Sequence, residues 1–361
     1  MGNRKFSVLV YNYEMRGKDS FMLSQFSLNG KSILITGGTG SFGKKCVEII
    51  LQRFRPEKLI IFSRDEEKQY QMAKALDLKK HTCLRFFLGD VRDLGRLHRA
   101  FEGVDYVIHA AALKHVPTAE YNPIEAIKTN ILGAENVLNA AIDNGVQKVV
   151  ALSTDKAACP INLYGATKLC SDKLFVAGNV YSGVKNTRFS IVRYGNVLGS
   201  RGSVVPLFLS LRSSGVIPIT DRRMTRFWMT LEQGVNIVLA GLGLMKGGEI
   251  FIPKIPSMKI IDLASTVAPN CQHEYVGIRP GEKLHELLIS EDDGPRTREY
   301  DEYFVIEPEF KCWTDSESGR NGGKPVPDGF SYASNTNSRW ISSEELYKLI
   351  PELQLPQQVA C

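Results

Sequence analysis

The sequence has few of the residue patterns that build metal centres or disulfide frameworks. Its seven cysteines are odd in number and form no Cys-x-x-Cys pair, and its six histidines form no His-x-x-x-His pattern. Closely spaced cysteine pairs are typical of zinc sites, and even cysteine sets are typical of secreted disulfide scaffolds. We therefore expect no metal and no disulfide framework, and we expect the protein to be cytoplasmic.

Long apolar runs and concentrated charge are also missing. No stretch approaches the roughly twenty apolar residues that a membrane-spanning helix needs. Asn12, Glu14 and Arg16 interrupt the apolar stretch near the amino end, which argues against a signal peptide. The formal net charge is +6, and the basic residues are spread out rather than clustered with aromatic ones. This distribution argues against a nucleic-acid or membrane partner and favours a small anionic substrate.

The sequence does contain a glycine-rich turn between a strand and a helix. Residues 32–36 form a short apolar run of strand type, and an amphipathic stretch covers 44 to about 53. Between them, Gly37 allows a tight turn, Gly40 lets the backbone approach a pyrophosphate, and Gly43 lets helix and strand pack closely. The predicted phosphate cradle consists of Gly37, Thr39, Gly40, Ser41, Phe42 and Gly43.

The second strand, near residues 59–62, ends in polar residues that bear on the choice of cofactor. In NAD-binding folds an acid at this position usually holds the ribose 2′-hydroxyl, whereas here Ser63 and Arg64 stand at the strand end. Lys68 follows one helical turn later. Basic groups there favour a 2′-phosphate and hence NADP. Asp65 lies close enough to leave NAD as the alternative.

Strands and helices alternate through the amino-terminal half. Further strands are expected near 84–88, 105–108 and 147, and helices near 66–79, 93–101 and 122–144. Asp90 and Val91 follow the third strand, where we expect Asp90 to meet the adenine, and Ala110 follows the fourth. Such alternation predicts βαβ units with right-handed crossovers. We therefore expect an α/β protein with a Rossmann-type doubly wound parallel sheet and a smaller mixed α/β C-terminal lobe.

Two neighbouring stretches carry the strongest chemical signal. Ser153-Thr154-Asp155-Lys156 supplies an acid and a primary amine, and Tyr164 and Lys168 follow four residues apart. Residues at that spacing share one helix face, so we expect the Lys168 ammonium to lower the pKa of the Tyr164 phenol. A tyrosine tuned in this way can take a proton from a sugar hydroxyl while hydride leaves the same carbon.

Together these motifs resemble the extended short-chain dehydrogenases/reductases, and within them the inverting UDP-N-acetylglucosamine 4,6-dehydratases that open pseudaminic acid biosynthesis. The resemblance extends from about residue 28 to 349 and includes TGGTGSFGK (36–44), HAAALKHVP (109–117), ALSTDKA (151–157), PINLYGATKL (160–169) and IRPGEKLHE (278–286). It implies NADP-dependent dehydration of UDP-N-acetylglucosamine with inversion at C5, by a homo-oligomer. The implied organisation is an N-terminal extension (1–27), an NADP-binding Rossmann domain (28–195), a nucleotide-sugar-binding lobe with segments returning to the Rossmann domain (196–350), and a tail (351–361).

The resemblance also implies functional residues. Further cofactor contacts are expected from Lys114, Tyr164, Lys168 and Val197. Substrate contacts are expected from Lys114, Asn196, Arg201, Thr220, Arg279 and Glu282, while Arg226 is equally compatible with a solvated side chain. Catalytic roles are expected for Thr154, Asp155, Lys156, Tyr164 and Lys168. Lys156 is the expected base at C5 and Asp155 the expected acid for the C6 hydroxyl, and we expect desolvation and Lys168 to lower the pKa of Lys156.

Three alternatives share the fold. A nucleotide-sugar 4-epimerase needs the Tyr/Lys pair but has no use for Asp155 and Lys156. A retaining dehydratase resembles this arrangement but has Glu after the Asp. A non-enzymatic NADP-binding module would be expected to lose catalytic residues, yet Asp155, Tyr164 and Lys168 are all present. The site residues therefore favour an inverting dehydratase.

Overall fold

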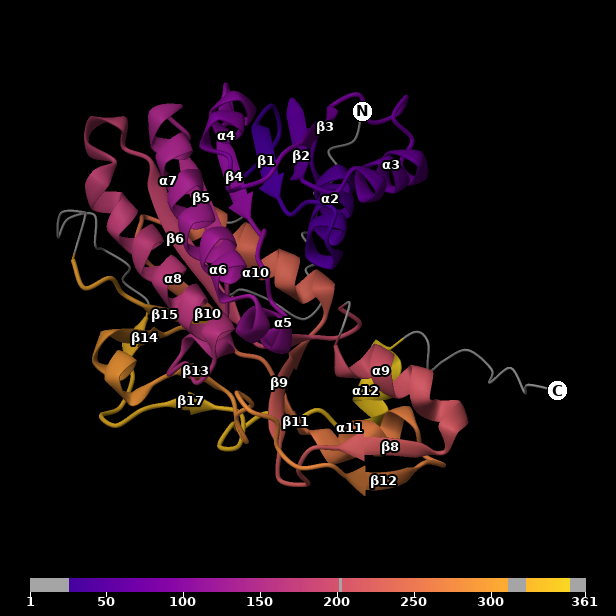
Figure 1. Ribbon diagram of the computed structural model, residues 1–361. Coiled ribbons are helices and arrows are strands. Elements are labelled where there is room, and N and C mark those ends of the chain that lie inside the picture. Colours follow the sequence, from indigo (N-terminus) through magenta and orange to yellow (C-terminus); the bar gives the residue numbers. More distant parts are fainter. Residues whose placement is uncertain (1–25, 201–202, 311–322, 351–361) are drawn as a thin grey trace, which may run out of the picture.

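The computed structural model describes residues 26–200, 203–310 and 323–350 (Figure 1). Arg201 and the predicted tail at 351–361 lie outside the described residues, as does the predicted N-terminal extension except for Phe26 and Ser27. Among the described ranges, no helix has the length and apolar character that a membrane crossing requires.

A ten-stranded sheet forms the centre of the protein, in the order β16-β14-β15-β10-β6-β5-β4-β1-β2-β3. Its strands are β1 (Ser32–Thr36), β2 (Lys58–Ser63), β3 (Leu84–Leu88), β4 (Tyr106–His109), β5 (Lys148–Thr154), β6 (Arg188–Tyr194), β10 (Ile250–Pro253), β14 (Thr297–Glu299), β15 (Tyr303–Ile306) and β16 (Lys324–Pro325). The strands from β10 to β3 run parallel, and the other three continue the sheet antiparallel. The order β3-β2-β1-β4-β5-β6 is that of a Rossmann-type doubly wound sheet, so the predicted fold class is confirmed.

Helices cover both faces of this sheet (Figure 1). They are α2 (Ser41–Arg53), α3 (Glu66–Ala75), α4 (Leu94–Phe101), α5 (Val116–Tyr121), α6 (Pro123–Ile127), α7 (Gly133–Asp143), α8 (Leu163–Tyr181) and α10 (Leu231–Leu244). Helices α4, α7 and α8 pack side by side on one face, and α2 packs against α10 on the other. Strands β1 and β2 are apolar and almost wholly buried, as expected of parallel strands covered on both faces.

Two predicted helices differ from the structure. The helix expected over 66–79 ends at Ala75, because the Asp77 carboxylate accepts from the backbone N–H groups of Lys79 and Lys80 and closes a turn. The helix expected over 122–144 is interrupted by a π-helical turn at Lys128–Leu132. That turn places the buried Asn130 against the loop after β4, where its side chain pairs with both backbone groups of Leu113.

The remaining residues build a second lobe below the sheet in Figure 1. Its elements are β7 (Asn196–Val197), β8 (Val216–Ile219), β9 (Thr225–Met229), β11 (Ser257–Lys259), β12 (Gln272–Tyr275), β13 (Leu287–Ile289), β17 (Tyr332–Ala333), α9 (Val204–Leu211), α11 (Ile260–Val267) and α12 (Ser343–Leu349). A separate apolar cluster, with Phe208 and Trp228 fully buried, forms its core. The division of the chain at residue 196 stays a prediction.

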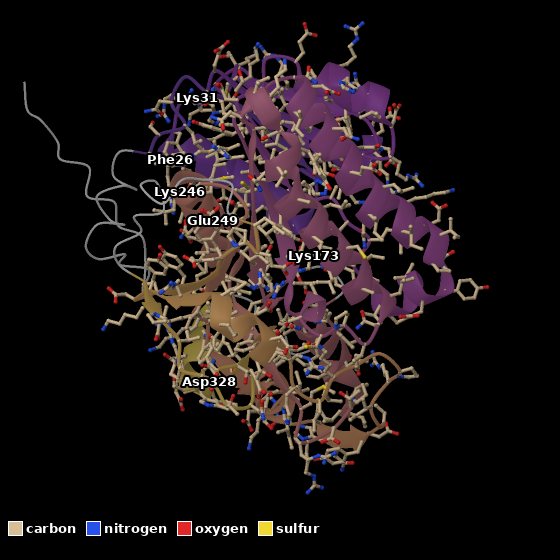
Figure 2. All side chains as sticks on the ribbon, turned by 90° about the vertical axis from the view of Figure 1, so that its left-hand side faces the viewer. Phe26, Lys31, Lys173, Lys246, Glu249 and Asp328 are labelled. Atoms are coloured by element: carbon tan, nitrogen blue, oxygen red, sulfur yellow. The ribbon has the colours of Figure 1, made fainter. Side chains whose placement is uncertain are left out.

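The joint between α10 and β10 rests on one buried acid, Glu249, labelled beside Lys246 in Figure 2. The Glu249 carboxylate accepts from the backbone N–H groups of Lys246 at 2.8 Å and Gly247 at 2.7 Å, and from the Ser190 hydroxyl at 2.6 Å. Because Ser190 belongs to β6, these hydrogen bonds fix β10 as the parallel neighbour of β6.

Gly165, near the start of α8, allows an unusually close approach of backbone segments. A Cβ at this position would lie 2.1 Å from the carbonyl oxygen of Lys156. The Asn162 side chain caps the helix by accepting from the Gly165 N–H at 2.7 Å. The absent side chain therefore brings Tyr164 against the segment that carries Lys156.

We expect Gly165→Ala to lower the free energy of unfolding by roughly 1–3 kcal/mol, because backbone must move to admit the methyl group. Gly234→Ala in α10 is the matched control, since its Cβ would meet only Met229 at 4.0 Å. That control should gain roughly 0.5–1 kcal/mol from helix propensity. Urea unfolding measures both, and an unchanged midpoint for Gly165→Ala would contradict the close-packing argument.

Candidate active site

The turn between β1 and α2 has the tight packing expected of a phosphate cradle. Gly37 has φ +66°, and a Cβ there would lie 2.9 Å from the Ala111 nitrogen. A Cβ on Gly43 would lie 2.5 Å from Gly38, so the first turn of α2 and the glycine-rich turn touch backbone to backbone. Gly40 stands at the N-cap of the thirteen-residue α2 and contributes no side chain there. Backbone donors at a helix start fit a bound pyrophosphate.

Thr39, Ser41 and Phe42 complete this turn. The Thr39 hydroxyl lies 2.7 Å from the Ser63 hydroxyl, which connects the glycine turn to the end of β2. Ser41 is the first residue of α2, and the Phe42 ring packs against the main apolar core. The structure therefore brings the predicted cradle and the predicted ribose-binding strand end together.

The basic residues after β2 already have acidic partners in the structure. Lys68 forms an ion pair with Asp65, whose carboxylate also caps α3. The Arg64 guanidinium lies 3.5 Å from the Asp90 carboxylate, and the Arg64 side chain is 54% exposed. Arg64 is thus held by only one long, exposed contact, whereas Lys68 is drawn toward Asp65.

Asp90 follows β3 and is held mainly by Arg92. Burial pushes the pKa of the Asp90 carboxyl upward, but hydrogen bonds from Arg92 outweigh it, and the net pKa lies below its ordinary value. Val91 beside it is buried, and its carbonyl accepts from Asn136 at 3.0 Å. Ala110 follows β4 and donates its N–H to Thr36 at the end of β1.

The predicted catalytic residues meet where β5 ends. Asp155 is fully buried, and its Oδ1 accepts from the Thr154 hydroxyl at 2.9 Å and from Lys156 Nζ at 3.0 Å. A Cβ on Gly195, which directly follows β6, would lie 3.4 Å from Asp155 Oδ2. Two neighbouring residues thus form an acid–amine pair, walled on one side by backbone.

A residue that the sequence interpretation missed completes this cluster. Glu286, just before β13 in the second lobe, places Oε1 3.2 Å from Lys156 Nζ and 3.6 Å from Arg226 Nε. Its side chain is 2% exposed. Arg226 is also buried, donates to backbone carbonyls of Thr225, Lys283 and Leu284, and so acts within the wall of the site. The acid ends the IRPGEKLHE stretch, which was the only signal that pointed to it.

The charges in this cluster overturn one expectation. Burial lowers the pKa of Lys156, but the Asp155 and Glu286 carboxylates outweigh it, so the pKa lies above its ordinary value. The prediction of a lowered pKa was wrong because it left out the attraction of the two carboxylates, Asp155 first and Glu286 second. Burial raises the pKa of Asp155, whereas the cations Lys156 and Arg226 overcome burial and lower the pKa of Glu286. Lys156 is therefore an ammonium in this state.

Tyr164 and Lys168 both lie on α8 as expected, but their pKa values do not follow the expectation drawn from their spacing. Burial raises the pKa of Tyr164 to about 12, with Lys156 and the Thr154 hydroxyl opposing the rise. Lys168 is itself buried, and burial lowers its pKa against the pull of Asp172. The predicted lowering of the Tyr164 pKa by Lys168 was wrong in this state, because burial disfavours both charged forms.

Lys114 lies in the loop after β4 near the same cluster. Burial lowers the pKa of Lys114, and repulsion from the Lys156 ammonium lowers it further. The loop is anchored one residue earlier by the two hydrogen bonds between Leu113 and Asn130. Lys114 is thus positioned where it could contact either cofactor or substrate.

The predicted substrate residues of the second lobe differ in their exposure and in their partners. Asn196 Oδ1 and Glu282 Oε2 are buried acceptors without a hydrogen-bond partner in the described part of the chain, so each can take a donor from a ligand. Thr220 is half-buried and donates to Met224, whereas Arg279 is exposed. Val197 pairs with Met229 across β7 and β9.

Two contacts fasten the second lobe to the catalytic segment. Lys283 Nζ donates to the Ala158 carbonyl at 2.6 Å, and Asn162 Nδ2 donates to the Gly281 carbonyl at 2.8 Å. Ala158 and Asn162 lie between Lys156 and Tyr164 in the chain, and Gly281 and Lys283 are the two neighbours of Glu282. Residues far apart in the chain therefore meet around one acid–amine pair.

Comparison with known proteins agrees with this geometry. The chain matches the family model described as polysaccharide biosynthesis protein over residues 33–308. It is 58% identical over 331 residues to the UDP-N-acetylglucosamine 4,6-dehydratase (inverting) of Campylobacter jejuni, covering 89% of this chain and 98% of that protein. It is 41% identical over 340 residues to the UDP-glucose 4-epimerase of Rickettsia canadensis, covering 91% and 97%.

A solved structure is also similar to this chain. The X-ray structure of Pen from Bacillus thuringiensis matches with a TM-score of 0.81 at 37% identity, over 91% of this chain and 100% of that chain. The family model covers most of this chain, and the Campylobacter relative shares more than half of its aligned residues. The chain therefore belongs to the polysaccharide biosynthesis protein family and, within it, to the inverting UDP-N-acetylglucosamine 4,6-dehydratases, which are hydro-lyases.

Proposed function

We propose that this protein dehydrates UDP-N-acetylglucosamine with NADP as cofactor and inverts C5, giving UDP-2-acetamido-2,6-dideoxy-β-L-arabino-hex-4-ulose. The observation that carries this proposal is the buried contact between Asp155 and Lys156, at 3.0 Å, beside Tyr164. Elimination across C5 and C6 needs an acid and a base side by side, and oxidation at C4 needs a separate base. The Campylobacter relative carries the name of this activity.

The residues present fit a nicotinamide dinucleotide. The start of α2 has space for a pyrophosphate beside Gly37, Gly40 and Gly43. The end of β2, where the cofactor ribose would lie, carries Ser63 and Arg64. When bound, the nicotinamide supplies a hydride acceptor for C4 and a hydride donor for C6, and its oxidised ring adds a positive charge near the phenol.

Tyr164 is the group that takes the proton of the C4 hydroxyl, so that C4 becomes a ketone. The Thr154 hydroxyl and the Lys156 ammonium both favour the ionised phenol against the effect of burial. Lys168, one helical turn further along α8, is the positioning cation for the sugar and cofactor ribose hydroxyls. The ketone then makes the C5 proton acidic.

Asp155 and Lys156 perform the elimination as one proton-sharing pair. A proton that moves from Lys156 Nζ to Asp155 across their 3.0 Å hydrogen bond turns the ammonium into a free amine and the carboxylate into an acid. Lys156 then removes the C5 proton, and Asp155 protonates the departing C6 hydroxyl, which leaves as water. The pair returns to its starting charges. Return of the hydride to C6 would then be matched by a proton from solvent that reaches C5 on the opposite face, which completes the inversion.

Substrate contacts follow from the second lobe. Asn196 Oδ1 and Glu282 Oε2 offer buried acceptors for sugar or nucleoside donors, and Lys114 and Arg279 offer cations for the diphosphate. Thr220 is proposed as a further substrate contact. We also propose Arg201 as a diphosphate contact. The pseudaminic acid pathway, the homo-oligomeric assembly and a cytoplasmic location remain parts of this proposal.

The second candidate is a nucleotide-sugar 4-epimerase, because a relative with that name is 41% identical over 91% of the chain. Epimerisation at C4 uses a tyrosine base and leaves C5 and C6 untouched. A buried acid–amine pair would have no proton to move in that reaction, so the Asp155–Lys156 contact favours the dehydratase.

Incubation with UDP-N-acetylglucosamine and NADP in deuterated water separates these candidates. We expect a 4-keto-6-deoxy product of L-arabino configuration with deuterium at C5, read by NMR, because the C5 proton exchanges during elimination. A retained D-xylo configuration would refute the inversion. A C4 epimer without deuterium at C5 would refute the dehydratase reaction itself.

Tyr164→Phe and Lys156→Ala should fail at different steps. Without a base at C4, Tyr164→Phe should form little reduced nicotinamide in a single turnover. Lys156→Ala should still permit oxidation at C4, so the absorbance of reduced nicotinamide should appear and persist while no deuterium enters C5. Loss of both signals in Lys156→Ala would show that Lys156 serves the first step instead.

Cofactor choice should depend on Arg64. We expect NADP to bind more tightly than NAD, and we expect Arg64→Ala to narrow the difference by roughly tenfold, the worth of one charge-assisted contact. Arg85→Ala is the control, because Arg85 lies near the start of β3, at the other end of that strand from Asp90. It should leave the ratio of NADP affinity to NAD affinity unchanged. Calorimetry measures the six affinities of the three proteins for the two cofactors, and equal binding of NAD and NADP to the unmodified protein would contradict the proposal.

A further inference from the structure

A second carboxylate contacts the amine that the proposed reaction uses as its base. Glu286 Oε1 lies 3.2 Å from Lys156 Nζ, almost as close as Asp155 Oδ1 at 3.0 Å. The two acids reach Lys156 from different parts of the fold, Asp155 from the end of β5 and Glu286 from the segment before β13. The Lys156 ammonium is thus held from both sides.

The backbone of Glu286 is fixed. Its N–H donates to the Ser334 hydroxyl at 2.9 Å, and its carbonyl accepts from the Ser334 N–H at 2.8 Å. Ser334 is fully buried, and its hydroxyl lies 2.7 Å from that of Thr225 on β9. A buried hydrogen-bond network that reaches β9 therefore fixes the point from which the Glu286 side chain extends toward Lys156.

Burial of the Glu286 carboxylate costs free energy of folding, so a purely structural role does not account for it. Glu286 is 2% exposed, and its Oε2 has no hydrogen-bond partner in the described part of the chain. A buried ion pair is on average no more stabilising than apolar side chains of the same volume. The position of Glu286 against Lys156 therefore calls for an explanation in the chemistry of the site.

We propose that Glu286 is a positioning residue for Lys156: its carboxylate holds the amine beside Asp155 and stays an anion while protons move within the Asp155–Lys156 pair. This inference deepens the proposed function and rests on it. Glu286 makes Lys156 a stronger base, because the ammonium that forms when Lys156 takes the C5 proton is stabilised at once by a second anion.

The charges around Lys156 support this role. Three cations and two anions face its amine, together with the Tyr164 phenol. They come from five segments of the chain and are Lys114 after β4, Asp155 after β5, Tyr164 in α8, Arg226 in β9, and Lys283 and Glu286 before β13. If Glu286 were neutral, Asp155 alone would oppose the three cations. The Lys156 ammonium would then lose its proton more easily.

The proton count closes without Glu286 gaining or losing a proton. Lys156 gives one proton to Asp155, Asp155 gives it to the leaving C6 hydroxyl, and Lys156 regains one from C5. One C–H bond and one C–O bond break, and one water leaves. Glu286 carries its negative charge throughout, in agreement with a pKa that Lys156, Arg226 and Lys283 hold below the ordinary value despite burial.

Glu286→Gln tests this role without requiring substrate. The amide keeps the size and a hydrogen-bonding oxygen but removes the charge, so the pKa of Lys156 should fall by roughly one pH unit or more. Acylation of Lys156 by acetic anhydride at pH 8, followed by peptide mass spectrometry, should then become about tenfold faster. Lys79, on a surface turn after α3, is the internal reference and should not change.

Glu299→Gln is the matched control. It removes the charge of another lysine partner, since Glu299 lies 2.7 Å from Lys254 at the far edge of the sheet. Labelling of Lys156 and turnover should both stay as in the unmodified protein. If Glu286→Gln does not fold, Glu286→Asp replaces it in the test. The shorter side chain retracts the carboxylate from Lys156, so Lys156 should be labelled faster than in the unmodified protein, but by less than the change expected for a neutral residue.

Turnover supplies the second measurement. In Glu286→Gln we expect kcat to fall at least tenfold with little change in KM, and the loss of rate at alkaline pH to begin at lower pH. A Lys156 labelling rate and an alkaline limb that match the unmodified protein would overturn the proposal. A changed labelling rate in a protein that does not dehydrate UDP-N-acetylglucosamine would retain the positioning of Lys156 and refute the proposed function.

Discussion

A single ammonium group between two buried carboxylates joins the parts of this protein. Asp155 arrives from the end of β5 and Glu286 from the second lobe, and Lys156 lies within 3.2 Å of both. Two carboxylates removed from water at this distance would repel strongly without a cation between them. Lys156 therefore offsets both carboxylates where the lobes meet, with Arg226 as a second cation beside Glu286, and the amine is held by contacts that also join the two lobes.

Missing side chains matter as much as charged ones in this arrangement. Gly165 lets α8 reach the Lys156 carbonyl, and a Cβ on Gly195 would lie 2.5 Å from Phe227. Backbone therefore lies close to the acid–amine pair, and neighbouring segments of the chain supply polar groups around it. This enclosure explains why burial governs the pKa values of Asp155, Tyr164 and Lys168.

The strands and the fold class could be predicted because apolar runs and glycine turns are local signals. The strands at 32–36 and 84–88 agree with β1 and β3 to the residue. The catalytic stretch was also found locally, since Asp155 and Lys156 are adjacent. The sequence did not reveal the role of Glu286, because its partner Lys156 lies far away in the chain. The predicted pKa directions of Lys156 and Tyr164 were wrong because burial is a property of the tertiary structure. The four-residue spacing of Tyr164 and Lys168 does not reveal it.

The division of the strands among sheets determines how the two lobes are joined. Strands β10, β15, β14 and β16 extend the large sheet beyond β6, and β10 is fixed to β6 by hydrogen bonds around Glu249. Glu286, by contrast, precedes β13, which pairs with β17 in a separate two-stranded sheet. A change in the angle between the lobes would therefore leave the large sheet intact and would first strain the contacts of Glu286 with Lys156 and of Lys283 with Ala158.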